Sequence, residues 1–507
     1  MPRRSDVVGR AASRLLILAV ALSAVAMFLA LSRGVYRLGF PLDDAWIHQT
    51  YARNLAGSGE WAFVPGEPSA GSTSPLWTTS LAVGHVLNVE PVWWAYLLGT
   101  ASLLLTAWLG AGWARRRTAG QAWLPAAVAL TIVLEWHLVW SAVSGMETLL
   151  LASAAVLALT LIESEAWRPF RVGLVIGVAV WIRPDALALL AAGGWRAWTE
   201  SGSSVRTRAA QTAGLLIGTA CALIPYLVFL RLTGGSWWPS TFYAKQAEYA
   251  ILTQTPLLNR LWDVARAPLV GAGGLLLLAG LAEAAGAVRL GKWTRLAPLV
   301  WTASYLGAYA LRLPVTYQHG RYQIPVVPVL IVLGWCGALD WLAPTSERWR
   351  WVAGRAWAGA VAVALLAFLV LGGRAYAQDV AIIESEMVDT ARWVSGHTPA
   401  EARVAAHDIG ALGYFGGRDL LDLAGLTDPE LIPILRDESA LGQAMVANRV
   451  DYLVTFPDWY PALSACGEVV HVSAGRFSPS AGGENMTVYR WRPDTFAARP
   501  ACMLYSP

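Results

Sequence analysis

Repeated apolar runs are the feature that most limits the folds open to this chain of 507 residues. Each run holds about 20 mainly apolar residues, enough for one helix to cross roughly 30 Å of hydrocarbon. With 56% hydrophobic and 14% charged residues, the chain is too apolar for an ordinary soluble protein. The sequence therefore predicts a multi-pass α-helical membrane protein with about 11 transmembrane helices. The expected spans are residues 12–31, 91–113, 121–141, 146–162, 169–182, 185–198, 208–232, 266–288, 296–312, 322–342 and 353–373.

The positions of the Lys and Arg residues predict which loops face the cytoplasm. Residues 75–88 form an apolar run of only about 14 residues, which is short for a crossing and suits a re-entrant or interfacial helix. If this run does not cross, the basic clusters all fall in loops on one side, as the positive-inside rule requires. A crossing would move every cluster to the opposite side. We therefore expect a cytoplasmic N-terminus and an extracytoplasmic first loop, residues 32–90.

The composition changes after residue 373 to that of a soluble domain. Short β-branched and apolar runs alternate there with turn residues, as in a small α/β domain. We therefore expect a transmembrane domain over residues 1–373 and an extracytoplasmic α/β domain over residues 374–507. Cys466 and Cys502 both fall in the second part, where a disulfide and two free thiols both stay open. The expected strands lie near residues 404–410, 420–423, 452–456, 469–472 and 486–490, with a helix near 429–446.

Two adjacent carboxylates, Asp43 and Asp44, follow the first apolar run and begin a helix-like stretch. One Asp is enough to cap a helix, so the second has no local structural reason. His48 lies one turn beyond Asp44 on the same helix face. We interpret the pair as catalytic: in sugar transfer from a lipid phosphate, one carboxylate takes the proton of the attacking hydroxyl. The other could position substrate or hold a divalent cation; a cap beside a solvated Asp is the alternative interpretation.

Basic side chains at the predicted outer boundary are candidates for binding an anionic lipid head group. A phosphate at the membrane interface requires Arg, Lys or a helix N-terminus within hydrogen-bond reach. The net charge of +4 is small and the basic residues are scattered, which excludes the basic face of a nucleic-acid-binding protein. The candidates are Arg183, Lys245, His319 and Arg321.

Arg183 is the most informative of these residues, because it interrupts an apolar segment next to a proline. An ionisable residue at membrane depth is a functional candidate by default. A structural ion pair with Asp185 or Glu147 is the alternative. Lys245 and Arg321 could instead extend to the interface without binding a ligand.

Other polar and aromatic residues allow a functional and a structural interpretation. The turn-rich stretch 57–75 could bind sugar through stacking on Trp61, or form an ordered loop without a ligand. In the C-terminal part, His407, Asp408 and Asp422 lie at the ends of expected strands. We interpret these three as hydrogen-bonded structural groups rather than catalytic ones.

Short motifs with a fixed order occupy residues 40–330. They are Leu42-Asp43-Asp44-Ala45 with Tyr51-Ala-Arg53-Asn54-Leu55, Thr73-Ser-Pro75-Leu-Trp77, Ser144-Gly-Met-Glu147, Arg183-Pro-Asp185, Thr241-Phe-Tyr243-Ala-Lys245 and Gly320-Arg321-Tyr322. In their order and common side they resemble the GT-C superfamily of polyprenyl-phosphate-dependent membrane glycosyltransferases. The likeness is greatest to the mycobacterial terminal arabinofuranosyltransferases and their bacterial relatives. Residues 408–414 also resemble the outer domain of such relatives.

The resemblance implies an inverting glycosyltransferase in a bacterial plasma membrane. Its donor would be a polyprenyl-phosphate sugar, and its acceptor a cell-envelope glycan or a lipid-linked molecule. The resemblance also implies that Asp43 is the base, with Asp44 as the second candidate. Arabinofuranose and hexose donors both stay open. A transporter or lipid flippase is the alternative from another class, because broken helices with charged turns occur there too. Against it, the sequence has no inverted repeat. The expected substrate-binding residues are Arg183, Lys245, His319, Arg321, His48, Glu147, Asp185, Tyr243 and Trp61.

Overall fold

The computed structural model describes residues 4–118, 121–200 and 202–498, and they divide into two compact units. Each unit is assembled from three separate stretches of chain, so sequence neighbours at the boundaries belong to different units. Unit 1 comprises Met1–Leu31, Tyr96–Tyr226 and Leu252–Ala375, and unit 2 comprises Ser32–Ala95, Leu227–Ile251 and Tyr376–Pro507.

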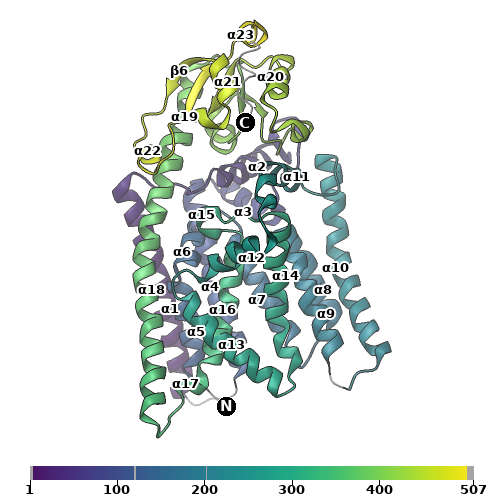
Figure 1. Ribbon diagram of the computed structural model, residues 1–507, viewed down its shortest axis with the longest axis vertical. Coiled ribbons are helices and arrows are strands. Elements are labelled where there is room, and N and C mark those ends of the chain that lie inside the picture. Colours follow the sequence, from purple (N-terminus) through teal and green to yellow (C-terminus); the bar gives the residue numbers. More distant parts are fainter. Residues whose placement is uncertain (1–3, 119–120, 201, 499–507) are drawn as a thin grey trace. The chain divides into compact units, whose positions relative to one another are not determined.

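Unit 1 is built of helices, which Figure 1 labels along the chain. Several begin with proline in the first turn, where its missing N–H has no cost. Helix α13 packs against α16, and α9 packs against α14. The helices are α1 (Arg4–Val35), α4 (Pro91–Arg117), α5 (Leu124–Leu134), α6 (Trp136–Ala142), α7 (Thr148–Ile162), α8 (Pro169–Val180), η1 (Pro184–Ala188), α9 (Leu189–Thr199), α10 (Val205–Gly234), α12 (Leu257–Arg266), η3 (Ala267–Leu269), α13 (Gly273–Arg289), η4 (Trp293–Leu296), α14 (Ala297–Arg312), α15 (Tyr317–Gly320), η5 (Ile324–Val326), α16 (Val327–Gly337), α17 (Leu339–Leu342) and α18 (Arg348–Ile382). Helices α1, α4, α10 and α18 each continue into unit 2.

Four helices of the described residues are long and apolar enough to cross a membrane, or up to six if each bent pair counts as one span. The predicted helical membrane architecture is therefore confirmed, whereas the number of about 11 spans is not. The expected span 121–141 is interrupted, because helices α5 and α6 meet at 61° at Glu135. The break expected between 169–182 and 185–198 is found, as α8 and α9 are separated by a turn at Arg183-Pro-Asp185. The 75–88 run forms the 12-residue helix α3, which is too short to be a candidate span.

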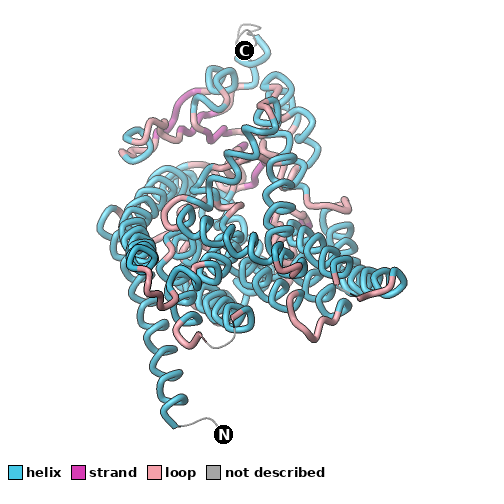
Figure 2. Tube along the Cα trace, turned by 60° about the horizontal axis from the view of Figure 1, so that its bottom comes forward, coloured by secondary structure: helices cyan, strands magenta, loops and turns pink. Residues whose placement is uncertain are grey.

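Unit 2 contains all the strands of the described residues, which are magenta in Figure 2. Its first stretch is mainly the helix pair α2 and α3, followed in chain order by α11. Its elements are α2 (Asp44–Ser58), β1 (Ala62–Val64), β2 (Glu67–Pro68), α3 (Pro75–Val86), α11 (Ser240–Glu248), η2 (Ala250–Gln254), η6 (Ile383–Val388), α19 (Asp389–His397), β3 (Arg403–Ala406), η7 (Leu412–Gly416), β4 (Asp419–Asp422), η8 (Pro429–Ile434), α20 (Glu438–Ala447), β5 (Tyr452–Thr455), η9 (Pro457–Trp459), α21 (Pro461–Cys466), β6 (Glu468–Val472), α22 (Phe477–Ser480), β7 (Thr487–Arg490) and α23 (Pro493–Ala498).

A five-stranded sheet of order β4-β3-β5-β7-β6 forms the centre of the C-terminal part. Strands β4, β3 and β5 are parallel, and β7 pairs antiparallel with both β5 and β6. Ala405, Leu421 and Leu453 are buried in its core together with Leu441 and Met445 of α20. The sheet confirms the five expected strands. Because parallel strands end at one edge, the residues that follow β3, β4 and β5 gather there.

Of the two cysteines in the C-terminal part, the structure describes one. Cys466 is buried at the end of α21. Cys502 lies outside the described residues, so the expected choice between pairing and free thiols stays a prediction.

Candidate active site

Asp43 and Asp44 have different surroundings in unit 2, although they are adjacent. Asp43 precedes α2 but does not cap it with its side chain. Its carboxylate instead accepts hydrogen bonds from the backbone N–H groups of Gly410, at 2.6 Å, and Ala411, at 2.8 Å. Only 8% of Asp43 is exposed. Both of its carboxylate oxygens are therefore used to hold the segment that follows β3.

The contact between Asp43 and residue 410 requires glycine. A Cβ atom on Gly410 would lie 2.1 Å from the carbonyl oxygen of Asp43 and 2.6 Å from its Oδ2. Burial, followed by the charge of Asp408, raises the pKa of Asp43, and the two N–H groups partly oppose the shift. Asp43 thus holds the segment that follows β3, and the same burial raises its pKa.

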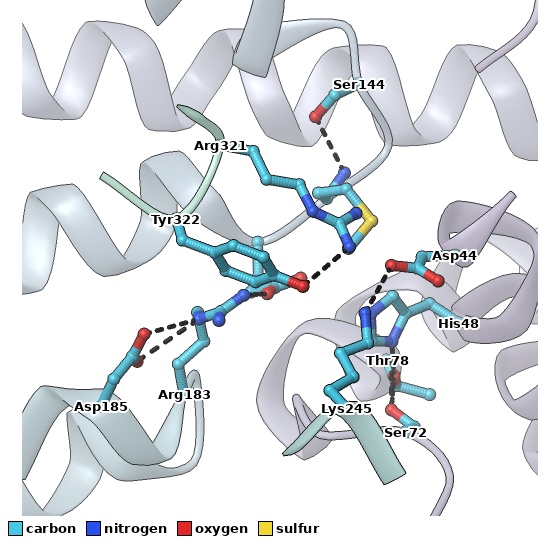
Figure 3. Close-up of polar contacts among 12 residues, drawn as sticks. Asp44, His48, Ser72, Thr78, Ser144, Arg183, Asp185, Lys245, Arg321 and Tyr322 are labelled. Carbon is cyan, nitrogen blue, oxygen red and sulfur yellow. Dashed lines mark hydrogen bonds and ion pairs between the residues drawn. The ribbon is translucent and has the colours of Figure 1, made fainter. Parts of the chain in front are cut away.

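Asp44 is the accessible member of the pair. Its side chain is 28% exposed, and its Oδ2 lies 3.2 Å from Nζ of Lys245 on α11 (Figure 3). The ammonium group favours the ionised carboxylate, which is the form a general base requires. Of the two aspartates, Asp44 is the more exposed, and a cation lies beside it.

His48 and Trp61 are two further candidates of unit 2, and each contacts neighbouring side chains of that unit. His48 is buried, and its Nδ1 lies 3.0 Å from Oγ of Ser72 and 3.1 Å from Oγ1 of Thr78, which joins α2 to α3. The ring of Trp61 packs at 5.5 Å from Tyr51 and 5.1 Å from Phe229. These contacts give both residues structural roles in the first loop.

Tyr243, on α11, has a more exposed position than the other candidates of unit 2. Its exposed fraction is 46%, and its ring centroid lies 5.5 Å from that of Phe242. A tyrosine with this exposure could reach a bound sugar or lipid.

The sheet edge contributes residues that sequence reasoning treated as structural. His407 directly follows β3, and its Nδ1 lies 2.7 Å from the hydroxyl of Tyr460. Oδ2 of Asp408 is buried and has no hydrogen-bond partner among the described residues. Burial raises the pKa of Asp408, His407 lowers it, and the charge of Asp44 raises it further. This influence brings Asp408 into the surroundings of Asp44, and its place after a parallel strand was the signal that could have indicated it.

In unit 1, Arg183 is held by an extensive set of partners (Figure 3). Its Nη1 donates to Oε1 of Glu147 at 2.7 Å, its Nε donates to Oδ2 of Asp185 at 3.1 Å, and its Nη2 donates to the Tyr309 hydroxyl at 3.2 Å. Glu147 is completely buried. The two carboxylates proposed as alternative structural partners are thus both present.

Arg321 and Tyr322 follow a strained turn in unit 1. Gln318, His319 and Gly320 all have positive φ angles, of 53°, 60° and 67°. Two non-glycine residues in this conformation are costly, and such strain is typical of functional loops. Nη2 of Arg321 donates to the Tyr322 hydroxyl at 2.9 Å, and its guanidinium carbon lies 4.8 Å from the centre of that ring.

Two aromatic rings determine the position of His319. Trp136 and Trp140 meet it edge-on, with ring centroids 5.4 Å and 5.6 Å from its own. The guanidinium of Arg183 also lies over the Tyr322 ring, at 5.2 Å. Two clusters of side chains therefore form in unit 1. In one, two tryptophan rings pack on His319, and in the other, two guanidinium groups lie at the Tyr322 ring.

A divalent cation does not fit the residues around the aspartate pair. The oxygens of Asp43 accept backbone N–H groups, and Asp44 is paired with Lys245. Among the described residues, no three His, Cys, Asp or Glu side chains form a group suited to a metal ion. The expected metal position at the aspartates therefore stays a prediction without a ligand set.

Comparisons with solved structures identify proteins of similar fold. ArnT from Cupriavidus metallidurans in the apo state is 15% identical, with a TM-score of 0.57 over 95% of this chain and 98% of that chain. The same protein bound to undecaprenyl phosphate matches with a TM-score of 0.54 and 15% identity over 94% and 97% of the two chains. The apo oligosaccharyltransferase of Archaeoglobus fulgidus is 13% identical, with a TM-score of 0.58 over 88% and 71% of the chains.

Sequence comparisons add a match for the C-terminal part. Residues 376–489 match a domain of unknown function, DUF8728. No curated protein sequence matches the chain. The structural likenesses therefore carry the comparison, and at 13–15% identity they show a fold shared with ArnT and with the archaeal oligosaccharyltransferase.

Proposed function

We propose that the protein is an inverting membrane glycosyltransferase that moves a sugar from a polyprenyl-phosphate donor to a hydroxyl group of a cell-envelope acceptor. The observation that carries the proposal is the ion pair of Asp44 with Lys245, beside an Asp43 whose carboxylate is already occupied. The fold supports the donor class, because similar structures contain undecaprenyl phosphate in ArnT and a dolichol-phosphate in the archaeal oligosaccharyltransferase AglB.

In this mechanism Asp44 acts as the general base. Its carboxylate takes the proton of the acceptor hydroxyl while that oxygen forms a bond to the anomeric carbon. The bond between the anomeric carbon and the phosphate oxygen breaks on the opposite face, so the configuration inverts. The electron pair leaves with the lipid phosphate, which is already a stable anion and needs no general acid. Lys245 stabilises the negative charge in this region.

Within unit 1, we propose Arg321 rather than Arg183 as the cation that binds a phosphate. Arg183 is committed to Glu147, Asp185 and Tyr309 and serves to hold the loop that carries Tyr322. Arg321 directly follows the strained turn, so the turn determines the position of this cation. A guanidinium suits a phosphate because it offers two parallel donors.

The base assignment is tested with purified membranes that contain the parent protein, Asp44→Asn or Asp419→Asn, the last being an exposed control. Each is given a panel of radiolabelled polyprenyl-phosphate arabinofuranose, mannose and glucose. We expect transfer from one donor by the parent and the control, and a loss of about 100- to 10,000-fold in Asp44→Asn. Undiminished transfer by Asp44→Asn would remove the base role. Lipid translocation by the parent without any transfer would replace the enzyme by a flippase.

The phosphate assignment is tested by titrating undecaprenyl phosphate into nanodiscs that contain Arg321→Gln or the exposed control Arg312→Gln. We expect Arg321→Gln to weaken binding about tenfold or more, since a charge-assisted hydrogen bond contributes about 1.5–3 kcal/mol. Equal affinity in both variants would exclude Arg321 as a phosphate ligand.

We further propose that the N-terminus is cytoplasmic and that the first loop and C-terminal domain are extracytoplasmic. Single cysteines at the exposed positions Glu67 and Arg116, in a background without the native cysteines, would report this orientation. A membrane-impermeant maleimide added to intact cells should label Glu67→Cys and leave Arg116→Cys unlabelled. Labelling of the opposite member, or of both, contradicts the proposed orientation.

A further inference from the structure

Helix α11 presents Lys245 to Asp44, and its N-terminal end is fixed by two loops of unit 2. Oγ of Ser240 donates to the carbonyl oxygen of Leu426, at 2.5 Å. Oγ1 of Thr241 donates to the carbonyl oxygen of Gly71, at 3.2 Å. Gly71 belongs to the first loop of the chain, residues 32–90, and Leu426 belongs to the domain of unknown function, residues 376–489.

The C-terminal end of α11 is held by the domain of unknown function. The Arg436 guanidinium donates to the carbonyl oxygens of Ala247, from Nε at 3.0 Å, and of Glu248, from Nη2. The last carbonyls of a helix have no partners within the helix, and a cation at this end interacts favourably with the helix dipole. Nε2 of His407 lies 3.7 Å from Oε1 of Glu248. Arg436 and His407, both of this domain, therefore contact the last turn of α11.

His407 is itself held in a fixed orientation. The hydroxyl of Tyr460 lies 2.7 Å from its Nδ1, and the ring of Trp459 meets it edge-on at 5.1 Å between centroids. With Nδ1 engaged, Nε2 is the nitrogen that faces Glu248. The imidazole thus links the edge of the sheet to the last turn of α11.

The contacts of Lys245 and Glu248 are mechanically coupled. The two residues are three positions apart on one helix, so their side chains lie on the same face, one turn from each other. Lys245 contacts Asp44, and Glu248 contacts His407. A movement of the last turn of α11 must therefore change the distance from Lys245 to Asp44.

We infer that the domain of unknown function completes the site formed by Asp44 and Lys245. In this domain, His407 is a positioning residue that holds Lys245 against Asp44 through Glu248. Its catalytic consequence rests on the proposed function, whereas the geometry it describes does not. The sequence pattern favours a structural group at a strand end for His407. The structure assigns it the specific task of fixing a helix that carries a site residue.

The charges around His407 predict how this link depends on pH. Burial lowers the pKa of His407, but the nearby Glu248 carboxylate and the charges of Asp408 and Asp422 raise the pKa above its ordinary value. Burial raises the pKa of Glu248, but the nearby His407 lowers it overall. The ion pair of His407 with Glu248 is therefore complete between the lowered pKa of Glu248 and the raised pKa of His407, and it is lost as the pH rises through the latter.

The reactivity of Lys245 offers a direct test, because Lys245 and Lys292 are the only two lysines of the chain. Lys292 is exposed and belongs to unit 1, so it serves as an internal reference. The full-length protein in detergent is pulsed with acetic anhydride at pH 6 to 9, and acetylation of each lysine is measured by mass spectrometry. We expect the Lys245 to Lys292 ratio to be low in the parent and to rise with pH.

In His407→Phe we expect the ratio to increase roughly two- to fivefold, the range that weakening a partly exposed ion pair gives, and to lose its extra pH dependence. Glu248→Gln should give the same result, and the double variant should add nothing further. His407→Gln, which keeps a donor near the position of Nε2, should restore part of the protection. A parent-like ratio in folded His407→Phe would overturn the inference, and Glu248→Gln decides the question if His407→Phe does not fold. Because labelling needs no donor, its outcome is independent of whether sugar transfer is found.

Discussion

Two adjacent carboxylates with the same chemistry have different tasks here because of what each one touches. The Asp43 oxygens accept backbone N–H groups of Gly410 and Ala411, whereas the Asp44 carboxylate meets an ammonium group and remains partly exposed. A buried acceptor that satisfies two donors is needed for folding, and an exposed one paired with a cation is available for chemistry. The same distinction can be measured separately as stability and as activity.

Replacing Asp43 by Asn is expected to reduce stability more than replacing Asp44. An Asn at position 43 presents an NH₂ group to one of the two backbone donors, which leaves a buried N–H without an acceptor, at a cost of about 1–3 kcal/mol. Asp44→Asn changes a partly exposed group and should shift the free energy of unfolding by less than about 1 kcal/mol. Thermal unfolding of both variants in one detergent tests this order, and a larger loss in Asp44→Asn would contradict it.

Gly410→Ala is expected to disturb the same contact from the other side. The added Cβ would lie 2.1 Å from the Asp43 carbonyl oxygen, and backbone atoms cannot move aside as the end of a side chain can. Overpacking of this kind costs about 1–3 kcal/mol. Gly396→Ala is the matched control, because a Cβ there meets nothing within 4 Å. Equal melting temperatures for the two variants would show that the contact yields easily.

Asp408 is expected to make stability dependent on pH. Burial and the charge of Asp44 raise its pKa to about 6 from its ordinary value, although His407 opposes the shift. A carboxyl whose pKa is raised by folding stabilises the fold at low pH, and this contribution is lost as the pH rises through about 6. Asp408→Asn should therefore flatten the decline between pH 5 and pH 8, with a gain on the order of 1–2 kcal/mol at pH 8. Parallel pH profiles for parent and variant would contradict this account.

Two elements illustrate how side chains that interrupt regular structure determine the shape of a site. At Glu135 the side chain accepts the backbone N–H of Leu138, so it begins α6 where α5 ends and the pair bends. In the turn before Arg321, Gln318 and His319 adopt positive φ angles that the surrounding residues must enforce. His319 packs edge-on between two tryptophans, and we attribute the enforcement to this packing.

Gln318→Gly is expected to stabilise the protein if the turn is strained as its angles indicate. Glycine adopts a φ angle of 53° without steric cost, whereas most residues lose about 1 kcal/mol or more there. Greater freedom of the unfolded glycine offsets part of the gain, so we expect a net rise in the free energy of unfolding of about 0.5 kcal/mol. Gln318→Val should instead destabilise, since a β-branched side chain fits this region poorly. A melting temperature that falls in Gln318→Gly would contradict the strain.

For the whole molecule, the sequence predicted elements well and contacts poorly. The short length of residues 75–88, the polar break at Arg183 and the five C-terminal strands depend on local composition, and all are found. The different tasks of Asp43 and Asp44 depend on Gly410, which is 367 positions from Asp43. No local pattern encodes such a pairing. The link from His407 to Glu248 escaped prediction for the same reason.

Unit 2 is assembled from three distant stretches of chain, so its first loop should depend on the C-terminal stretch for its order. Arg53 of α2 donates to the carbonyl oxygens of Gly413, at 3.1 Å, and Tyr414, at 2.7 Å, and Asp43 holds the preceding turn. A chain ending at Ala375 lacks all these partners but keeps every residue of α7 and its unit 1 neighbours.

We therefore expect hydrogen exchange of peptides from α2 to accelerate strongly in the shortened chain, while peptides from α7 keep their protection. Arg53→Met in the full-length chain should give a smaller effect in the same peptides, since it removes two hydrogen bonds and leaves those of Asp43 in place. Unchanged exchange of α2 in the shortened chain, with α7 protected, would mean that the first loop is ordered without the C-terminal stretch. That result would also remove the structural reason for Asp43 to differ from Asp44.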